Sequence, residues 1–241
     1  MSTRHPGTVI SFSGVQRFVT RHNDAQRLAL AKDWIRFVAK QKPLVICLPA
    51  GFLWAATLAD RDYWVTQLMM LSAECGIALS FGIDLSTPAP ARQHAVSGIY
   101  LCHRGRLICL IQSDDEVRST RCLWLEGWKV GLLLAREIFP PESRHQAMAL
   151  RPDLWLLHSH VGATRRWRPA LQRLARSAPV VLVGGQQQNP EVESLLVSGD
   201  RVAVTEAFSV LRHLVPIPAI EPDWEHSIEY GEPRAHAILG K

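Results

Sequence analysis

The chain has 241 residues, of which 47% are hydrophobic and 20% are charged, and its formal net charge is +5. This length fits one large α/β domain and leaves little room for two full domains. No apolar run approaches the roughly 20 residues needed to cross a bilayer, and the N-terminus lacks the pattern of a secretory signal. We therefore expect a cytoplasmic protein with no membrane contact, and the modest positive charge argues against nucleic acid as its main partner.

The cysteines form no pattern that would predict a disulfide framework or a zinc site. They are odd in number, contain no CxxC pair and lack Cys/His ligand spacing, which predicts reduced and mostly buried thiols and no metal. The five are Cys47, Cys75, Cys102, Cys109 and Cys122. Gly184-Gly185, followed by glutamines, lacks the remaining residues of a phosphate-binding motif, so a turn is the better interpretation and no cofactor is predicted.

Strand-like and helix-like patterns alternate along the first half of the chain, which indicates an α/β fold. Asn23 or Asp24 is expected to cap the first helix, which ends near Lys42, and Gly76 is expected to end the second. The helix pattern covers residues 24–42 and 62–75, and the strand pattern covers residues 8–13, 44–50 and 77–82. His103-Arg-Gly-Arg106 is expected to turn a hairpin between residues 97–101 and 106–112, after a loop at 86–94.

The second half continues the alternation. Pro140-Pro141 favours a helix start, and Thr164 can cap a helix that carries Trp167 on its apolar face. Strands are predicted at residues 122–128, 129–135, 154–160, 179–185, 194–197, 201–204 and 210–217. From Pro218 onward the sequence is polar and interrupted by prolines, so we expect one domain at residues 1–217 and a C-terminal tail at 218–241.

One segment of this pattern is specific enough to suggest a family. Residues 129–144 read KVGLLLAREIFPPESR and are followed by the strand pattern LWLLHS. The segment resembles the G-x-x-x-C-[YRW]-[DE]-x-x-x-P-E sequence of the nitrilase superfamily of carbon–nitrogen hydrolases. Trp167, Arg176 and Val180-Val-Leu-Val resemble the helix and strand that follow it, and the order of elements fits from Thr8 to Val215. The resemblance implies an αββα sandwich, with four layers in a single domain, that pairs as a homodimer or heteromer.

The resemblance also identifies three positions at which the family's catalytic residues are missing. The family uses a cysteine nucleophile, a glutamate base and an oxyanion-stabilising lysine, and each role needs its own functional group. The matching positions hold Ala50 for the glutamate, Gln112 for the lysine and Ala135 for the cysteine. Lys129 matches a different lysine of the family, which precedes the glycine. Glu137 matches an acidic residue with a structural role at the turn that follows the strand and carries position 135, which we call the elbow. The leading hypothesis is therefore a pseudoenzyme that acts by binding or as an oligomeric scaffold or partner subunit.

Two other hypotheses remain. An amidohydrolase or N-acyltransferase acting on C–N bonds could use a relocated nucleophile, Cys122 or Cys47, although apolar strands favour inert thiols. The second alternative is an anion or nucleic-acid binder that uses the arginine-rich helix with Arg165, Arg166, Arg168, Arg173 and Arg176.

Four further residues are candidates for lining the pocket. His158 and His160 alternate along a strand and are expected to face one side, where they could bind an anion or a metal. Histidines bonded by backbone groups are the simpler interpretation. Trp54, in an expected loop, and Glu137 complete the set.

Overall fold

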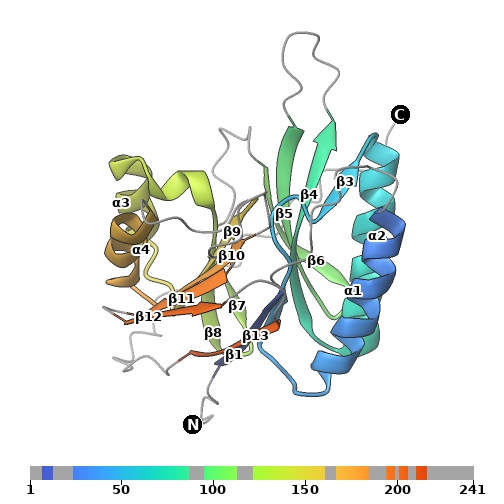
Figure 1. The fold of residues 1–241 in the computed structure, drawn as a ribbon, viewed down its shortest axis with the longest axis horizontal. Helices are drawn as coiled ribbons and strands as arrows, with labels where there is room; N and C mark the ends of the chain where they lie inside the picture. The colour runs from blue at the N-terminus through green and yellow to red at the C-terminus, as the bar shows by residue number, and fades with distance from the viewer. Residues whose placement is uncertain are drawn as a thin grey trace.

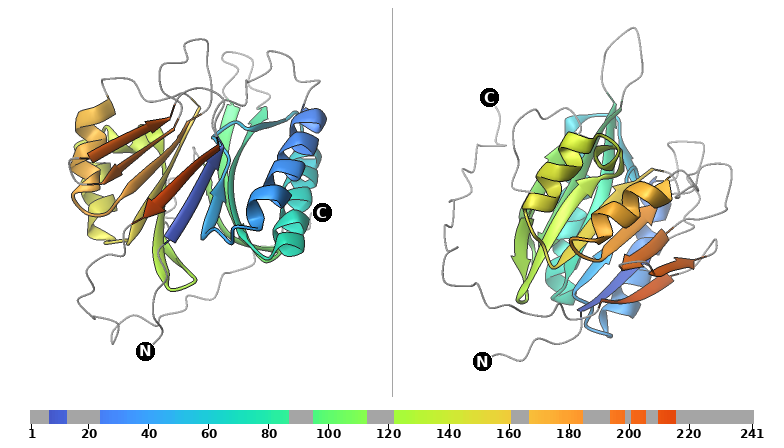
Figure 2. Two further views of the ribbon diagram at one scale, coloured as in Figure 1. Left: turned by 60° about the horizontal axis from the view of Figure 1, so that its bottom comes forward. Right: turned by 90° about the vertical axis from the view of Figure 1, so that its left-hand side faces the viewer.

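The computed structural model describes residues 7–12, 24–86, 95–112, 122–160, 167–184, 194–198, 201–205 and 210–215. Two β-sheets pack face to face, and a pair of helices covers the outer face of each sheet (Figure 1). The same four layers are visible when the molecule is turned (Figure 2). The predicted αββα sandwich is confirmed.

The first sheet has seven strands and carries most of the N-terminal half of the chain. Its order is β13-β1-β2-β4-β5-β6, with β3 added alongside β4. Within it β2 lies parallel to both β1 and β4, whereas β4, β5 and β6 form an antiparallel meander. The strands are β1 (Gly7–Phe12), β2 (Val45–Cys47), β3 (Leu53–Ala55), β4 (Ala78–Ser86), β5 (Ala95–His103), β6 (Arg106–Gln112) and β13 (Val210–Val215).

The second sheet has six strands in the order β12-β11-β10-β9-β8-β7. Its central strands β8, β9 and β10 are parallel, and both ends of the sheet are antiparallel. The strands are β7 (Cys122–Leu125), β8 (Trp128–Leu134), β9 (Leu154–Ser159), β10 (Val180–Gly184), β11 (Ser194–Ser198) and β12 (Arg201–Thr205).

Three layers of apolar side chains hold the four layers of secondary structure together. Helices α1 (Asp24–Ala39) and α2 (Leu58–Cys75) pack on the first sheet through one cluster. Helices α3 (Pro141–Ala149) and α4 (Arg168–Ala175) pack on the second through another. The middle cluster lies between the sheets, and alternation along the strands sorts the side chains: on β8, Val130, Leu132 and Leu134 face the other sheet while Leu133 faces the helices.

Helix α2 begins four residues before the predicted start at Asp62. Thr57 and Asp60 form a reciprocal capping box, in which the Thr57 hydroxyl accepts from the Asp60 backbone N–H and the Asp60 carboxylate accepts from the Thr57 backbone N–H. Gly76 follows the helix in the left-handed conformation, at φ 66°, as predicted from its position.

Two details of the sheets differ from the sequence prediction. Glu126 and Gly127, both with positive φ, turn the chain between β7 and β8, so the first strand ends three residues before the predicted Trp128. The segment after Ala50, expected to be a loop, contains the short strand β3. The predicted hairpin between β5 and β6 is confirmed, and Arg104 and Gly105 turn it with positive φ.

Several predictions fall wholly or partly outside the described residues. They concern the loop expected between residues 86 and 94, Thr164 as a cap, the turn at Gly184-Gly185 and the tail at 218–241. Among the helices that the structure describes, none has the length and apolarity of a membrane span. A cytoplasmic location stays a prediction.

Candidate functional site

Two of the three positions that the resemblance assigns to the triad lie at buried strand ends on facing sheets. Ala50 follows β2 and is 4% exposed, and Ala135 directly follows β8 and is 7% exposed. The backbone of Gln112 ends β6 opposite Gly98 of β5, and its side chain is outside the described part of the structure. Each alanine presents a methyl group, which offers neither a nucleophile nor a base.

The turn that bears Ala135 is held in place by Glu137. Ala135 opens the short 3₁₀ helix η2 (Ala135–Ile138), and the Leu134 backbone N–H donates to Glu137 Oε2 over 2.8 Å. The carboxylate thus accepts from a backbone donor at the end of the strand. This hydrogen bond gives Glu137 a structural function at the elbow.

Gly131 has a packing role that its place in the sequence motif does not reveal. A Cβ at this position would collide with the indole ring of Trp155 on the neighbouring strand β9. The indole is fully buried, and its N–H donates to Ser177 Oγ over 3.2 Å. Glycine at position 131 therefore allows the indole to lie flat on β8 four residues before the elbow.

His158 bridges the two sheets from the end of β9. Its Nδ1 lies 3.0 Å from the Leu48 carbonyl oxygen, and its Nε2 lies 2.7 Å from Ser80 Oγ. Since a carbonyl only accepts, Nδ1 bears the proton and Nε2 accepts from the Ser80 hydroxyl in the neutral ring. Complete burial, opposed by the bond to Leu48, lowers the pKa of His158 to about 4. The neutral imidazole is thus a buried link between β9 and β4.

His160 lies two residues further along and pairs with a carboxylate. Its Nε2 is 2.8 Å from Asp84 Oδ1 and 3.1 Å from Oδ2. The His160 side chain is 32% exposed, while the Asp84 side chain is 2% exposed. The pair borders the triad position of Ala50, because a Cβ on Gly51 would lie 2.6 Å from Asp84 Oδ2 and 2.7 Å from His160 Cδ2. Gly51 also adopts a φ of 62°, which favours glycine.

Both histidines therefore reach the same strand of the opposite sheet, as the alternation along β9 predicts. Their partners Ser80 and Asp84 were not among the residues selected from the sequence. A signal existed, because Ser80, Gly82 and Asp84 alternate with Leu79, Phe81 and Ile83 in a strand that is otherwise apolar. A period-two polar stripe in a strand covered on both faces indicates polar side chains pointing between the layers.

The segment after Ala50 is fixed to the start of α1. The Trp54 backbone N–H donates to Asp24 Oδ2 over 3.2 Å, and Arg27 Nη1 donates to the Phe52 carbonyl over 2.6 Å. Arg27 and Asp24 also form a buried ion pair at 3.3 Å. The half-buried Trp54 indole donates to Ser86 Oγ over 3.0 Å, so this side chain lies along the β3–β4 edge.

The described cysteines lie in environments that disfavour thiolates. Cys47, Cys75, Cys102 and Cys122 are free thiols. Burial raises the pKa of Cys47 far above its ordinary range, and it raises the pKa of Cys102 to about 12. Burial also raises the pKa of Cys122 to about 11, although Lys129 acts in the opposite direction. Cys122 packs in the cluster between the second sheet and its helices, on the side of the sheet away from the middle core.

The candidate metal site and the arginine-rich helix give little indication of a ligand. Within the described ranges, no three His, Cys, Asp or Glu side chains gather closely enough to hold a metal ion. Arg168, Arg173 and Arg176 are exposed on and just after α4, whereas Arg165 and Arg166 are outside the described residues.

The order of the strands, the four layers and the elbow after β8 together define the fold of the nitrilase superfamily. Comparison with solved structures supports this assignment. A cysteine-to-alanine mutant of an amidase of the nitrilase superfamily from Nesterenkonia AN1 aligns with a TM-score of 0.68 at 15% identity, over 90% of this chain and 92% of the amidase. A CN-hydrolase superfamily protein from Xanthomonas campestris, with an arsenic adduct in its active site, aligns with a TM-score of 0.65 at 16% identity, over 88% and 91% of the two chains.

A third neighbour is an amidase structure that contains a bound amide. The Nesterenkonia amidase in a cysteine-to-alanine mutant complexed with butyramide aligns with a TM-score of 0.67 at 15% identity, over 88% of this chain and 91% of the amidase. No family model and no curated protein matches the sequence. The shared feature is thus the fold.

Proposed function

We propose that this chain is a degenerate member of the nitrilase superfamily that has lost cysteine-dependent C–N hydrolysis and acts by binding. It would serve as an oligomeric scaffold or as the partner subunit of another protein. One observation carries the proposal: alanine follows both β2 and β8, at the positions of the base and the nucleophile, while the elbow hydrogen bond of Glu137 is intact. The fold is retained where the reactive groups are absent.

The chemical argument depends on the loss of groups that work together. In the family's mechanism a thiolate attacks the amide or nitrile carbon, and collapse of the intermediate needs a group that exchanges protons. Neither Ala50 nor Ala135 can supply one. Because triad residues act as a unit, removal of the nucleophile alone lowers the rate by several orders of magnitude in triad proteases, and we expect the same here.

The polar groups that remain near Ala50 support binding. The His160–Asp84 pair is partly exposed, borders Gly51 and can hydrogen-bond a polar ligand. Both ring nitrogens of His158 are already hydrogen-bonded, to Ser80 and to the Leu48 carbonyl, and the low pKa of His158 keeps the ring neutral. A ligand bound by the His160–Asp84 pair would therefore contact the His160 imidazole with no nucleophile beside it.

The alternative enzyme with a relocated nucleophile has weaker support. Cys122 is opposite Gly131 in the β7–β8 ladder, four residues before Ala135. At about 3.3 Å per strand residue, roughly 13 Å separates the two positions along the strand. With its pKa near 11 and its side chain against the helices, the Cys122 thiol is poorly suited to attack a substrate near Ala50.

Thiol labelling of the folded chain tests the proposal against this alternative. The protein is exposed to iodoacetamide at pH 7.5, and labelled sites are found by peptide mass spectrometry over a time course. We expect Cys47, Cys102 and Cys122 to react at least tenfold more slowly than the same sites in the urea-unfolded chain, because their folded pKa values are high. The Cys122→Ser variant serves as the control for peptide assignment.

Labelling of Cys122 faster than in the unfolded chain would contradict the proposal, because it would reveal an activated thiol.

A further inference from the structure

Helix α1 carries large apolar side chains beside its core-facing side. The core-facing side consists of Leu28, Ala31, Ile35 and Val38. A second apolar group, which we call the α1 stripe, consists of Leu30, Trp34 and Phe37, and these are 54%, 44% and 60% exposed. At about 100° per residue, the stripe lies roughly 110° around the helix from the core-facing side. The Trp34 and Phe37 rings meet edge to face with centroids 6.2 Å apart, and an exposed apolar surface of this kind indicates a binding site.

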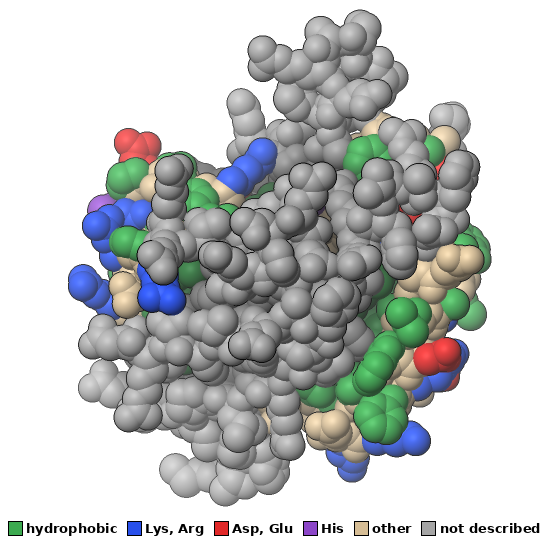
Figure 3. All heavy atoms as spheres, viewed as in Figure 1, with side chains coloured by type: hydrophobic (Ala, Val, Ile, Leu, Met, Phe, Trp, Pro, Cys, Tyr) green, Lys and Arg blue, Asp and Glu red, His purple; other side chains and the backbone are tan. Residues whose placement is uncertain are grey.

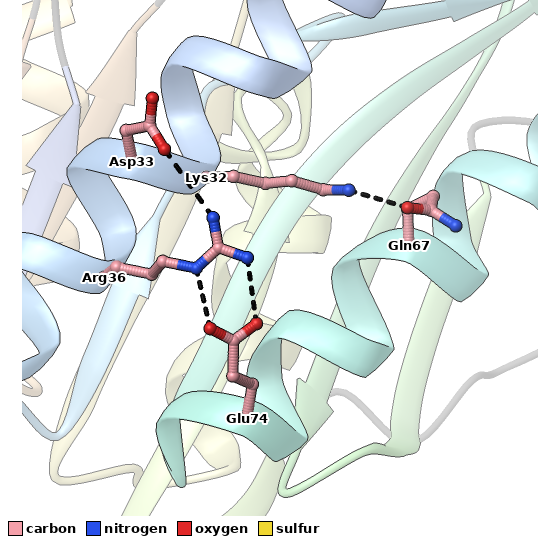
Figure 4. Close-up of polar contacts among 5 residues, drawn as sticks. All are labelled: Lys32, Asp33, Arg36, Gln67 and Glu74. Carbon is pink, nitrogen blue, oxygen red and sulfur yellow. Dashed lines mark hydrogen bonds and ion pairs between the residues drawn. The ribbon is translucent and has the colours of Figure 1, made fainter.

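The α1 stripe faces away from the neighbouring helix α2. Lys32 and Arg36 of α1 point toward α2, where Lys32 Nζ donates to Gln67 Oε1 over 2.6 Å (Figure 4). Arg36 forms two hydrogen bonds with the Glu74 carboxylate, at 2.7 and 3.0 Å. Because α2 packs on β4 and β5, the other flank of α1 is directed toward the β1–β13 edge of the sheet. Hydrophobic side chains gather over this helical layer at the lower right of Figure 3.

The chain leaves the first sheet close to the C-terminal end of α1. Val215 ends β13 and pairs with Gly7, the first residue of β1. The carbonyl of the next residue, Thr8, accepts from the Leu44 backbone N–H over 2.8 Å. Leu44 follows the last residue of α1 by five positions. The segment after Val215 therefore begins beside the end of α1 that carries Phe37.

The sequence after Val215 complements the α1 stripe in pattern and in charge. Four apolar residues recur at intervals of three, four and four, which is the spacing of one apolar face: Ile217, Ile220, Trp224 and Ile228. Residues 221–232 contain five carboxylates and no Lys or Arg, although the whole chain has a net charge of +5. Lys40 and Lys42 are exposed at the end of α1, and neither has an ion-pair partner among the described residues. An acidic and apolar segment thus begins beside an apolar surface that is flanked by lysines.

We propose that residues 216–232 bind the α1 stripe of the same chain, with Trp224 packed against Trp34 and Phe37 and with the carboxylates near Lys40 and Lys42. The residues from 216 to 224 can span about 30 Å when extended, which exceeds the roughly 24 Å length of α1. A segment tethered so close has a high effective concentration at this surface, so modest contacts suffice to hold it. The surface is on α1 and outside the strand ends, so the inference goes beyond the proposed function and does not depend on it.

Proteolysis of the full chain by a glutamate-specific protease tests this docking. Mass spectrometry follows cleavage after Glu225 and Glu229, and a synthetic peptide of residues 216–241 gives the rate for the unbound segment. We expect cleavage in the wild-type chain to be at least roughly tenfold slower than in the peptide, because proteolysis follows the population of the undocked form. Trp34→Glu should bring the rate to within about twofold of the peptide, since it places a charge at the centre of the stripe.

Charge variants test the contact with the lysines. The double variant K40E/K42E should speed cleavage about threefold, because it sets like charges against one another. Adding E221K/D223K to this variant should return the rate to within about twofold of the wild type, because the swap restores opposite charges. Failure of this addition to restore protection would overturn the contact with the lysines.

Trp124→Glu is the matched control, because Trp124 is an exposed aromatic residue of β7 in the other sheet and should leave cleavage unchanged. Circular dichroism establishes that every variant is folded. Three results would overturn the proposal. They are cleavage of the wild-type segment as fast as in the peptide, protection that Trp34→Glu leaves intact, and protection that roughly hundredfold dilution abolishes, which would place the segment on a second copy.

Discussion

Gly131 and Trp155 illustrate how a single glycine determines packing beside the elbow. The glycine leaves room for the indole, and no flexible side-chain end is available to yield, because the ring is buried and bonded to Ser177. Gly131→Ala should lower the free energy of unfolding by about 1–3 kcal/mol, the usual cost of overpacking a core. Urea titration of the purified variant measures this change.

A double-mutant cycle with Trp155→Leu identifies the cause of that loss. If the methyl group strains the indole, the double variant should be more stable than the sum of the two single effects predicts. Strict additivity would show that Gly131→Ala acts elsewhere.

His158 gives the fold a predictable dependence on pH. Its folded pKa of about 4 is below the ordinary value of 6.5, so between these limits the unfolded chain binds a proton that the folded chain does not. Stability is therefore highest above about pH 6.5 and falls as the pH drops toward 4. At about 1.4 kcal/mol per pKa unit, the total loss is on the order of 3 kcal/mol.

Urea titrations from pH 4 to pH 7 measure this slope. His158→Gln should reduce the slope, and His145→Gln, which changes an exposed histidine on α3, should leave it as in the wild type. An unchanged slope in His158→Gln would contradict the assigned neutral bridge.

At the scale of elements, the capping box of α2 fixes where that helix begins. Thr57→Ala removes the acceptor for the Asp60 N–H and should cost about 1 kcal/mol. Thr57→Ser keeps the hydroxyl and should cost less than half as much. Thermal unfolding followed by circular dichroism compares the two, and equal losses would argue against the cap.

Most elements could be predicted from the sequence, including the short strand β2, whereas β3 could not. The helix α2 is recognisable from its helical spacing of apolar residues, and β9 and β10 are recognisable as continuous apolar runs between turn residues. Three residues, as in β3, are too few to show a period, and its pairing with β4 comes from tertiary contacts. The turn at Glu126-Gly127 was missed because apolar residues flank it on both sides without a break.

At the scale of the whole molecule, the candidate site depends on contacts between the two sheets. The resemblance supplied the positions of Ala50 and Ala135, and alternation predicted that His158 and His160 share a face. Their partners were beyond prediction from the sequence, because His158 and Ser80 are 78 residues apart, and His160 and Asp84 are 76 apart. Only the packing of β9 over β4 joins them.

The same packing leaves the strand ends with imidazole and carboxylate groups but with methyl groups at two of the positions that the resemblance assigns to the triad. Turnover is therefore the most direct test of the central claim. Ammonia release from small aliphatic amides and nitriles should not exceed the rate without protein. Release that increases with the concentration of the wild-type chain, and that Cys122→Ser or His160→Ala abolishes, would contradict the claim.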